Sequence, residues 1–338
     1  MYIGILICGL GFFLLSFVNS LPMLYVAIIL GIVLGSSLGY LIPISVLIAN
    51  GFREKRSLAF GIFRTGPGLS GVLMPVIGWM IVAWGWRNAA VASAAIIFSV
   101  GLPMAWFINR IYRLEVTEAH EKAGTESIAH SRRPVSNDTQ FTLSEALRLK
   151  TFWFLSIAMA LRHMVTEGVS VHFVILLVDR GWSMEAASSL LGLSALIGAP
   201  ARIGVGWMGD VLDKRRLTMG LLLGLSFSVV LMGYTAEAVI FTPCMIIYSL
   251  AYGGLASLQE PIRADYFGTK AFATIQGMSR SVQTAGTFMG PIIAGIFYDL
   301  TKSYMIAFAL FAAVSLVSLG FMLLAQPPNS RAAAPGIA

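Results

Sequence analysis

Ionisable side chains occur inside long apolar runs of this sequence, and Arg162, His163 and Glu167 share one such run while Arg202 lies in the next. Burying a charge in such surroundings costs free energy unless an opposite charge or water lies beside it, so each of these residues is a candidate functional group. Because an arginine fork can hold a carboxylate through two hydrogen bonds, Arg162 and Arg202 could bind an anionic solute. His163 and Glu167 are four residues apart on one helix face and could form a proton-sensitive pair.

Each of these groups also has a purely structural interpretation. Arg162 and Glu167 could stabilise each other across neighbouring helices, and Arg202 could extend its guanidinium toward the membrane surface and help to fix the loop that follows. Tyr40 and Tyr252 could donate hydrogen bonds to a solute, but most such side chains simply pack. The sequence leaves both kinds of interpretation open.

Two further pairs of charged residues are expected to have structural roles. Arg64 and Arg280 occupy matching places about two turns inside the ends of their apolar runs, and this duplication favours a role in holding an inner gate. Glu260 and Arg263 lie near a helix end, where a solvated ion pair is the simplest interpretation.

Composition determines which elements must position these residues. With 57% hydrophobic and 12% charged residues and a mean hydropathy of +0.81, the chain does not fit an ordinary soluble domain. A bilayer core about 30 Å thick needs about 20 apolar residues of helix, and continuous rather than alternating apolarity favours helices over barrel strands. We therefore predict an all-α membrane protein with ten transmembrane helices. The apolar runs are 3–20, 23–48, 57–82, 88–109, 153–178, 184–208, 218–236, 239–262, 272–296 and 304–325.

Lysine and arginine are concentrated in alternate loops, which predicts the orientation of the chain in the membrane. The loops that are poor in lysine and arginine hold only Arg87, Arg180 and Lys302. The loops that are rich in them, together with both termini, are therefore expected in the cytoplasm. The net charge of +7 is spread between apolar runs rather than gathered on one face, so nucleic acid is not an expected partner. The lipid bilayer is the expected surrounding.

A long polar segment separates two groups of runs. We predict a bundle over 1–109, a cytoplasmic linker over 110–152, a six-span bundle over 153–326 and a cytoplasmic tail over 327–338. Thr142-Leu-Ser-Glu145 fits a capping box that opens a short amphipathic helix at the end of the linker.

An internal repeat relates the two groups of runs at an offset of about 216 residues. Gly61-Ile-Phe-Arg64 recurs as Gly277-Met-Ser-Arg280, and Pro75 recurs as Pro291. The pattern predicts two pseudo-symmetric six-span bundles, of which the first lacks two spans. Met1 is then interpreted as an internal start or the start of a truncated gene model.

The stretch from Gly206 to Arg216 combines a glycine, an aspartate and a basic cluster between two runs. Its residues Gly206, Asp210, Lys214, Arg215 and Arg216 resemble the signature loop of the major facilitator superfamily, in its second-half copy. With the repeat and the central linker, the chain resembles these transporters from their third to their twelfth span. The resemblance implies a monomer in the cell membrane, either inner or plasma, that exposes a midplane site alternately to each side.

A narrower resemblance concerns Ala201-Arg202-x-x-x-Gly206. It is similar to the monocarboxylate porter and oxalate–formate antiporter branch, in which an intramembrane arginine pairs with the substrate carboxylate. The porters also place an aspartate one turn before that arginine, and Gly198 stands there in this chain. The resemblance implies transport of a small organic anion such as a monocarboxylate, with protons as a possible coupling partner.

Other classes of function find less support in the sequence. We found no nucleophile–base constellation, metal-ligand cluster or phosphate loop, so neither an enzyme, nor a cofactor, nor a metal is expected. Gly66-Pro-Gly-Leu-Ser-Gly71 has the spacing of a dinucleotide loop but lies inside an apolar run, where close helix packing explains it better. A non-transporting membrane sensor or accessory protein, and an inactive fragment of a transporter, remain the alternatives.

Overall fold

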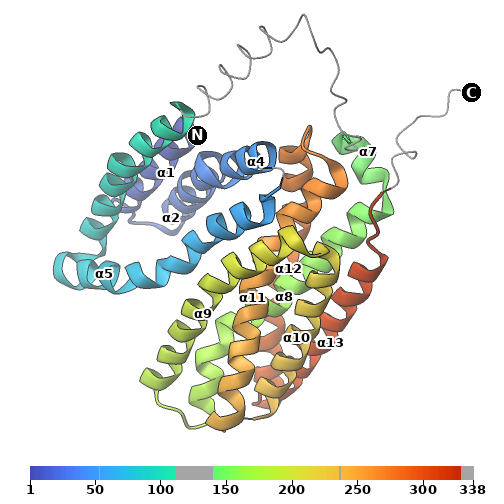
Figure 1. Cartoon of the computed structure of the whole chain (residues 1–338). Helices are drawn as coiled ribbons and strands as arrows, with labels where there is room; N and C mark the ends of the chain where they lie inside the picture. Colours follow the sequence, from blue (N-terminus) through green and yellow to red (C-terminus); the bar gives the residue numbers. More distant parts are fainter. Residues whose placement is uncertain (53, 111–139, 236, 329–338) are drawn as a thin grey trace, which may run out of the picture. The chain divides into compact units, whose positions relative to one another are not determined.

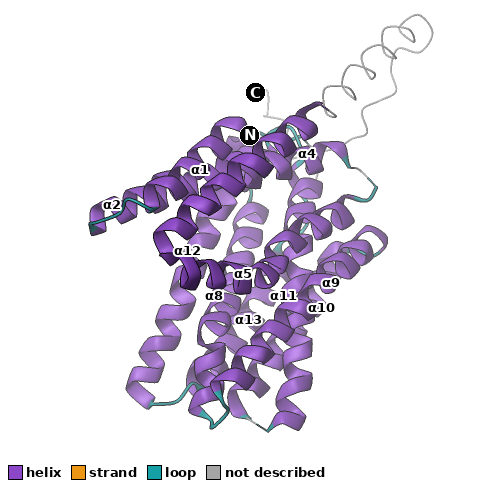
Figure 2. Ribbon diagram, turned by 90° about the vertical axis from the view of Figure 1, so that its left-hand side faces the viewer, coloured by secondary structure: helices purple, strands orange, loops and turns teal. Residues whose placement is uncertain are grey.

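The computed structural model describes residues 1–52, 54–110, 140–235 and 237–328, with backbone alone for 67–75. Regular structure within these ranges is entirely helical (Figure 2). Each apolar run of the sequence falls on a helical segment, so the predicted all-α class is confirmed. The predicted linker lies mostly outside the described residues, and so does most of the tail.

The helices follow the apolar runs closely. The first part of the chain forms α1 (Tyr2–Leu15), a continuous series of α2 (Leu21–Val26), η1 (Ala27–Val33), α3 (Leu34–Ser36), η2 (Ser37–Leu41) and α4 (Ile42–Gly51), then α5 (Arg56–Ile96) and η3 (Ile97–Gly101). The second part forms α7 (Leu143–Arg148), α8 (Lys150–Asp179), α9 (Met184–Val211), α10 (Lys214–Tyr234), α11 (Ala238–Phe267), α12 (Phe272–Thr301) and α13 (Met305–Leu324).

Within the described residues, 7 helices are long and apolar enough to cross a membrane. The other three expected spans are helical but depart from that standard. The 14-residue α1 is short, α12 carries several polar side chains, and the expected span 57–82 includes residues 67–75, for which only the backbone is described. The two runs that meet in α5 are separated by a break at Gly85, whose φ of 79° favours glycine.

The chain forms two compact units, which we describe separately. The first contains 1–47 and 72–138, and the second contains 48–71 and 139–338. The stretch 48–71, which the repeat assigns to the N-terminal bundle, therefore packs with the C-terminal part of the chain. Its contacts with Asp210 and Glu260 give the physical reason, as described below.

Paired glycines hold the first unit together. A Cβ atom on Gly11 would lie 2.6 Å from the Cα of Gly31, and one on Gly4 would lie 2.1 Å from the backbone nitrogen of Gly39. These distances are shorter than real contacts, so α1 approaches η1 and η2 to a separation that only glycine permits. Small residues bring membrane helices together in this way, because lipid supplies no hydrophobic drive between them.

We expect Gly11→Ala to destabilise the protein by about 1–3 kcal/mol, because the added methyl group must push two backbones apart. Gly78→Ala is the matched control in the same unit, since no described atom lies within 4 Å of a Cβ placed there. That variant should be neutral or slightly stabilising. Thermal unfolding of both variants in detergent measures the difference, and equal melting temperatures would contradict the close approach of α1.

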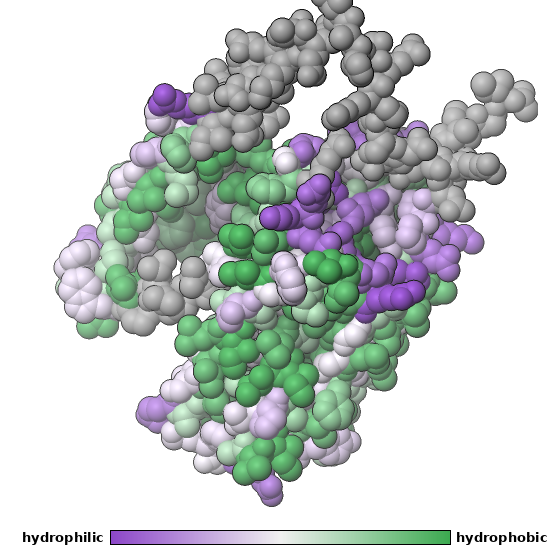
Figure 3. Space-filling model, viewed as in Figure 1, coloured by the Kyte–Doolittle hydropathy of each residue, from purple (hydrophilic) through white to green (hydrophobic). Residues whose placement is uncertain are grey.

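In the second unit, α8 packs against α12, α9 against α11 and α10 against α13 (Figure 1). Buried aromatic rings fill the interior, among them those of Phe173, Phe241 and Phe308. Figure 3 shows apolar side chains over the flanks of these helices and polar ones gathered toward the end where α7 lies. This distribution suits helices whose flanks face lipid.

The capping box predicted at the end of the linker is present at the start of α7. The backbone N–H of Thr142 donates to Glu145 Oε2 at 2.7 Å, and the backbone N–H of Glu145 donates to Thr142 Oγ1 at 3.4 Å. The first of these bonds holds the pKa of the Glu145 carboxyl below its ordinary value of 4.5.

A carboxyl whose pKa is lowered by folding stabilises the folded state fully above its unfolded pKa. We therefore expect the box to support α7 above pH 4.5 and to lose this effect as the pH falls through the lower, folded value. Hydrogen exchange of residues 143–148 between about pH 7 and pH 3 measures it. Glu145→Gln should remove the pH dependence of the protection that is specific to α7, and an unchanged dependence would contradict the assignment.

Candidate functional site

Three arginines are buried in the described part of the second unit, and two of them, Arg162 and Arg202, are the predicted anion-binding residues. Arg162 lies midway along α8 and is 2% exposed, and Arg202 lies in the second half of α9 and is 6% exposed. Both helices are long and apolar enough to cross a membrane. The structure thus places both predicted anion-binding residues in the interior, where a charge needs a partner.

Arg162 contacts only neutral groups at hydrogen-bonding distance. Its Nη2 lies 2.6 Å from His163 Nε2 and 3.4 Å from Gln259 Oε1. Because a guanidinium only donates, His163 accepts through Nε2 and carries its hydrogen on Nδ1. Arg162 Nε has no hydrogen-bond partner among the described residues, and no carboxylate there forms an ion pair with this side chain.

Arg202 is likewise left with donor capacity. Its guanidinium carbon lies 5.7 Å from the centre of the Tyr252 ring, which places the charge over an aromatic face. Arg202 Nη1 is buried and has no hydrogen-bond partner in the described part of the chain. The Tyr252 ring in turn stacks on Tyr248, with ring centres 6.1 Å apart. Arg202 and Tyr252, both predicted as solute-binding, are therefore brought together.

Glu260 is the residue whose surroundings sequence reasoning misjudged. It was expected in a solvated pair with Arg263, but its side chain is completely buried, so that expectation is wrong. Glu260 Oε1 accepts from Arg64, from Arg280 Nη2 at 3.4 Å and from Gln276 Nε2 at 3.2 Å. Arg263 donates to Gln276 instead. The sequence offered one signal, which was the duplicated placement of Arg64 and Arg280.

Gln259 connects this ion cluster to Arg162. Its Oε1 accepts from Arg162, and its Nε2 donates to Glu260 Oε1 at 3.0 Å. One buried network therefore runs from α8 through α11 to α5 and α12. The network contains four arginines, Arg64, Arg162, Arg263 and Arg280, and one glutamate, to which only Arg64 and Arg280 donate directly, so it carries a net positive charge.

The other candidate residues are arranged differently. No hydrogen bond or ion pair joins His163 to Glu167 in the residues that the structure covers, because His163 turns to Arg162. Glu167 is half-buried. Tyr40 belongs to the first unit, where its side chain is 44% exposed.

The two repeat-related prolines both lie within helices. Pro75 belongs to the part of α5 for which only the backbone is described, and Pro291 lies in α12. The carbonyl of Pro291 accepts from His172 Nε2 at 3.1 Å, and the hydroxyl of Tyr304 lies 3.0 Å from His172 Nδ1. Sequence reasoning had singled out neither His172 nor Tyr304.

The signature loop binds the start of α5. Asp210 accepts hydrogen bonds from the backbone N–H groups of Ser57 at 2.7 Å and Leu58 at 2.9 Å. A carboxylate is well placed at a helix N-terminus, where free N–H groups and the helix dipole favour negative charge. Gly206 permits this approach, since a Cβ atom there would lie 2.7 Å from the carbonyl oxygen of Ser57.

The basic end of the signature loop has different partners. Lys214 forms an ion pair with Asp265 at 2.8 Å, and Asp265 also binds Arg56 at 2.8 Å. Arg215 donates to the backbone carbonyl of Met322, near the end of α13, at 3.2 Å. Arg216 is exposed. These contacts tie α5, α11 and α13 to the loop and give it a structural rather than a solute-binding arrangement.

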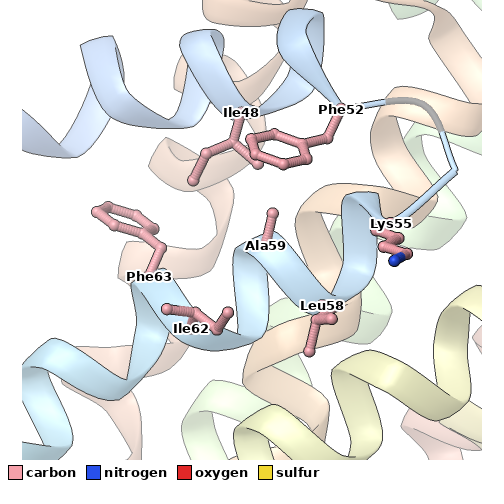
Figure 4. Close-up of a pocket in the computed structure, with 7 residues that line it drawn as sticks. All are labelled: Ile48, Phe52, Lys55, Leu58, Ala59, Ile62 and Phe63. Carbon is pink, nitrogen blue, oxygen red and sulfur yellow. The ribbon is translucent and has the colours of Figure 1, made fainter. Parts of the chain in front are cut away.

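A separate apolar cavity of about 330 Å³ lies between α4 and α5. Figure 4 shows Ile48 of α4 and Phe52, which directly follows α4, projecting toward the side of α5 that carries Ala59, with Lys55 at one end. None of the buried arginines lines it. It is therefore distinct from the arginine network.

Comparisons with known proteins agree with the helical architecture. A family model described as Major Facilitator Superfamily matches residues 1–259. Monocarboxylate transporter 13 of Bos taurus is 26% identical over 327 residues, covering 95% of this chain and 71% of the relative. Monocarboxylate transporter 12 of Mus musculus is 25% identical over 345 residues, covering 95% and 70%.

Two solved structures share the fold. The human organic anion transporter MFSD10 aligns with a TM-score of 0.66 at 16% identity, covering 94% of this chain and 76% of that one. The fucose:proton symporter FucP of E. coli aligns with a TM-score of 0.66 at 13% identity, covering 96% and 83%.

Proposed function

Because this chain belongs to the major facilitator superfamily, we propose that it is a secondary transporter that moves a small organic anion across a membrane by alternating access. The family transports small solutes, and the chain is an integral multi-pass membrane protein rather than an enzyme. The observation that carries the choice of an anion is that Arg162 and Arg202, on two neighbouring apolar helices, are buried, form no ion pair and each keep an unpartnered donor among the described residues.

A carboxylate is the anion that suits these donors best. Leaving a buried donor unsatisfied costs about 1–3 kcal/mol, and more for a charged group, so an anion that supplies the missing acceptors gains that energy on binding. A carboxylate oxygen accepts several hydrogen bonds and matches the planar guanidinium fork. The names of the relatives, monocarboxylate transporters, and of one fold neighbour, an organic anion transporter, agree with this chemistry.

The remaining parts of the proposal follow from the sequence. The bundles 1–109 and 153–326 would rock around the anion site, with both termini on the cytoplasmic side of the cell membrane and one chain as the working unit. His163, which accepts from Arg162, and Glu167, on the same helix face, are the proposed proton-coupling residues. Arg64 and Arg280 would hold the inner gate through Glu260.

Uptake by the purified protein in liposomes tests this function. Labelled acetate, lactate and succinate are compared with choline as a cation and glucose as a neutral solute. We expect saturable uptake of at least one carboxylate, competed by other carboxylates and absent for choline and glucose. Binding of carboxylates without uptake would overturn transport and favour a sensor or accessory protein, and the absence of both would indicate an inactive fragment.

A further inference from the structure

We propose that the apolar cavity between α4 and α5 binds one acyl chain of an anionic phospholipid, whose phosphate is held by Lys55. This is a second site, apart from Arg162 and Arg202, and it stands whether or not the chain transports an anion. Three observations carry it. The cavity is lined by apolar side chains except for Lys55, it is open to the surroundings of the helices, and Lys55 has no acidic partner among the described residues.

The lining of the cavity suits a flexible apolar chain. Its volume of about 330 Å³ lies near the lower end of the roughly 300–1,000 Å³ that is usual for ligand cavities. Figure 4 shows the small side chain of Ala59 facing the space that Ile48 and Phe52 border from the other side. Because these side chains are hydrocarbons, they offer no hydrogen bond to a polar solute. The gain that the cavity can supply is the burial of methylene groups.

The cavity is open at the surface of the helices. Phe52 is 48% exposed and Ile62 is 57% exposed, so both border its entrance, whereas Ile48 is buried. All the lining residues belong to the second unit, so the cavity is formed within one unit. The exposed apolar flank of a membrane helix faces acyl chains. A lipid can therefore enter from the side.

Lys55 gives the cavity its preference for an anion. It lies between the end of α4 and the start of α5, it is exposed, and it forms no ion pair in the described ranges. Its neighbour Arg56 is already engaged by Asp265. The adjacent Glu54 does not line the cavity and pairs with no described basic side chain. The ammonium group of Lys55 is thus available to phosphate oxygens.

The position of Lys55 in the chain matches the depth of lipid headgroups. It follows the apolar run 23–48 and precedes the run 57–82, so it lies at a membrane surface. The distribution of lysine and arginine predicts that this surface is the cytoplasmic one, which carries anionic lipids. An apolar cavity with an ammonium group at one end therefore fits the two parts of one phospholipid, whereas a small soluble anion would leave the cavity unfilled.

Photo-crosslinking tests the proposal on the whole chain in nanodiscs of unlabelled phosphatidylcholine. Phosphatidylglycerol and phosphatidylcholine, each with a diazirine on one acyl chain, are added separately at the same low fraction, and the labelled peptides are identified by mass spectrometry. We expect phosphatidylglycerol to label the segment 48–63 about fivefold more strongly, the factor that one basic residue contributes at a membrane surface.

Two variants separate the headgroup from the acyl chain. Lys55→Gln should bring the ratio of labelling by the two lipids to near one. Ala59→Phe fills the cavity and should remove most of the labelling of 48–63 by both lipids. Lys150→Gln is the matched control, because Lys150 is exposed and lies outside the cavity, and it should keep the ratio of the unaltered protein. Since Lys55 is exposed and unpaired among the described residues, Lys55→Gln keeps the test decisive if Ala59→Phe does not fold.

Three results would overturn the proposal. The first is equal labelling of 48–63 by the two lipids in the unaltered protein, and the second is a ratio that survives Lys55→Gln. The third is the absence of labelling in this segment. If the particles then contain two chains by mass photometry, a second copy of the protein covers the cavity in place of a lipid.

Discussion

Replacing Glu260 by glutamine is expected to destabilise the second unit by about 3–5 kcal/mol, the usual cost of removing one partner of a buried ion pair. Glu260 is completely buried, and it is the carboxylate on which Arg64 and Arg280 converge from α5 and α12. Without its charge these arginines repel each other, and the amide oxygen that remains is a neutral and weaker acceptor. Denaturant or thermal unfolding in detergent measures the loss.

Asp265→Asn is the matched control for this prediction. Asp265 also joins two basic residues, Arg56 and Lys214, but its side chain is 37% exposed. Water screens such a pair, so the control should cost no more than about 1 kcal/mol. Equal losses for the two variants would contradict the assignment of Glu260 as a buried centre of charge.

Replacing Arg162 by glutamine is expected to weaken carboxylate binding about 10- to 100-fold, because a charge-assisted contact in the interior is lost. The same change should leave the stability nearly unaltered or raise it. Arg162 forms no ion pair in the described ranges, and removing a buried unpaired charge relieves a desolvation cost. Titration with succinate and with lactate, combined with an unfolding measurement, separates the two effects.

Arg148→Gln provides the control for charge alone. Arg148 is exposed in α7, so its loss removes the same charge from the chain without touching the interior. Binding should then be unchanged. If Arg162→Gln binds both carboxylates as tightly as the unaltered protein does, the arginine has a structural role.

The sequence predicted the helices well because their signal is local. A run of apolar residues has few options in lipid besides a helix, so α8 to α13 fall close to the expected runs. The capping box at Thr142 was readable for the same reason, since both of its partners lie within four residues. The break expected between the runs 57–82 and 88–109 falls at Gly85 of α5, although the left-handed backbone angle that makes it depends on the local fold and not on composition.

The candidate site was only partly readable because its contacts are long-range. The spacing of His163 and Glu167 allowed a pair, but rotamer choice turned His163 to Arg162. Glu260 looked like a helix-end residue, and its burial depends on Arg64, which lies 196 residues away in the chain. Hydropathy identifies which charges are enclosed, whereas packing between distant helices decides which charges meet.

Uptake of labelled succinate and lactate by Arg202→Gln, side by side with the unaltered protein in the same liposomes, tests the central claim most directly. Flotation of the protein with the liposomes shows that insertion is equal. We predict saturable uptake by the unaltered protein and less than about one tenth of it by the variant, since the buried donor of Arg202 no longer meets the anion. Uptake by the variant equal to that of the unaltered protein would contradict the claim.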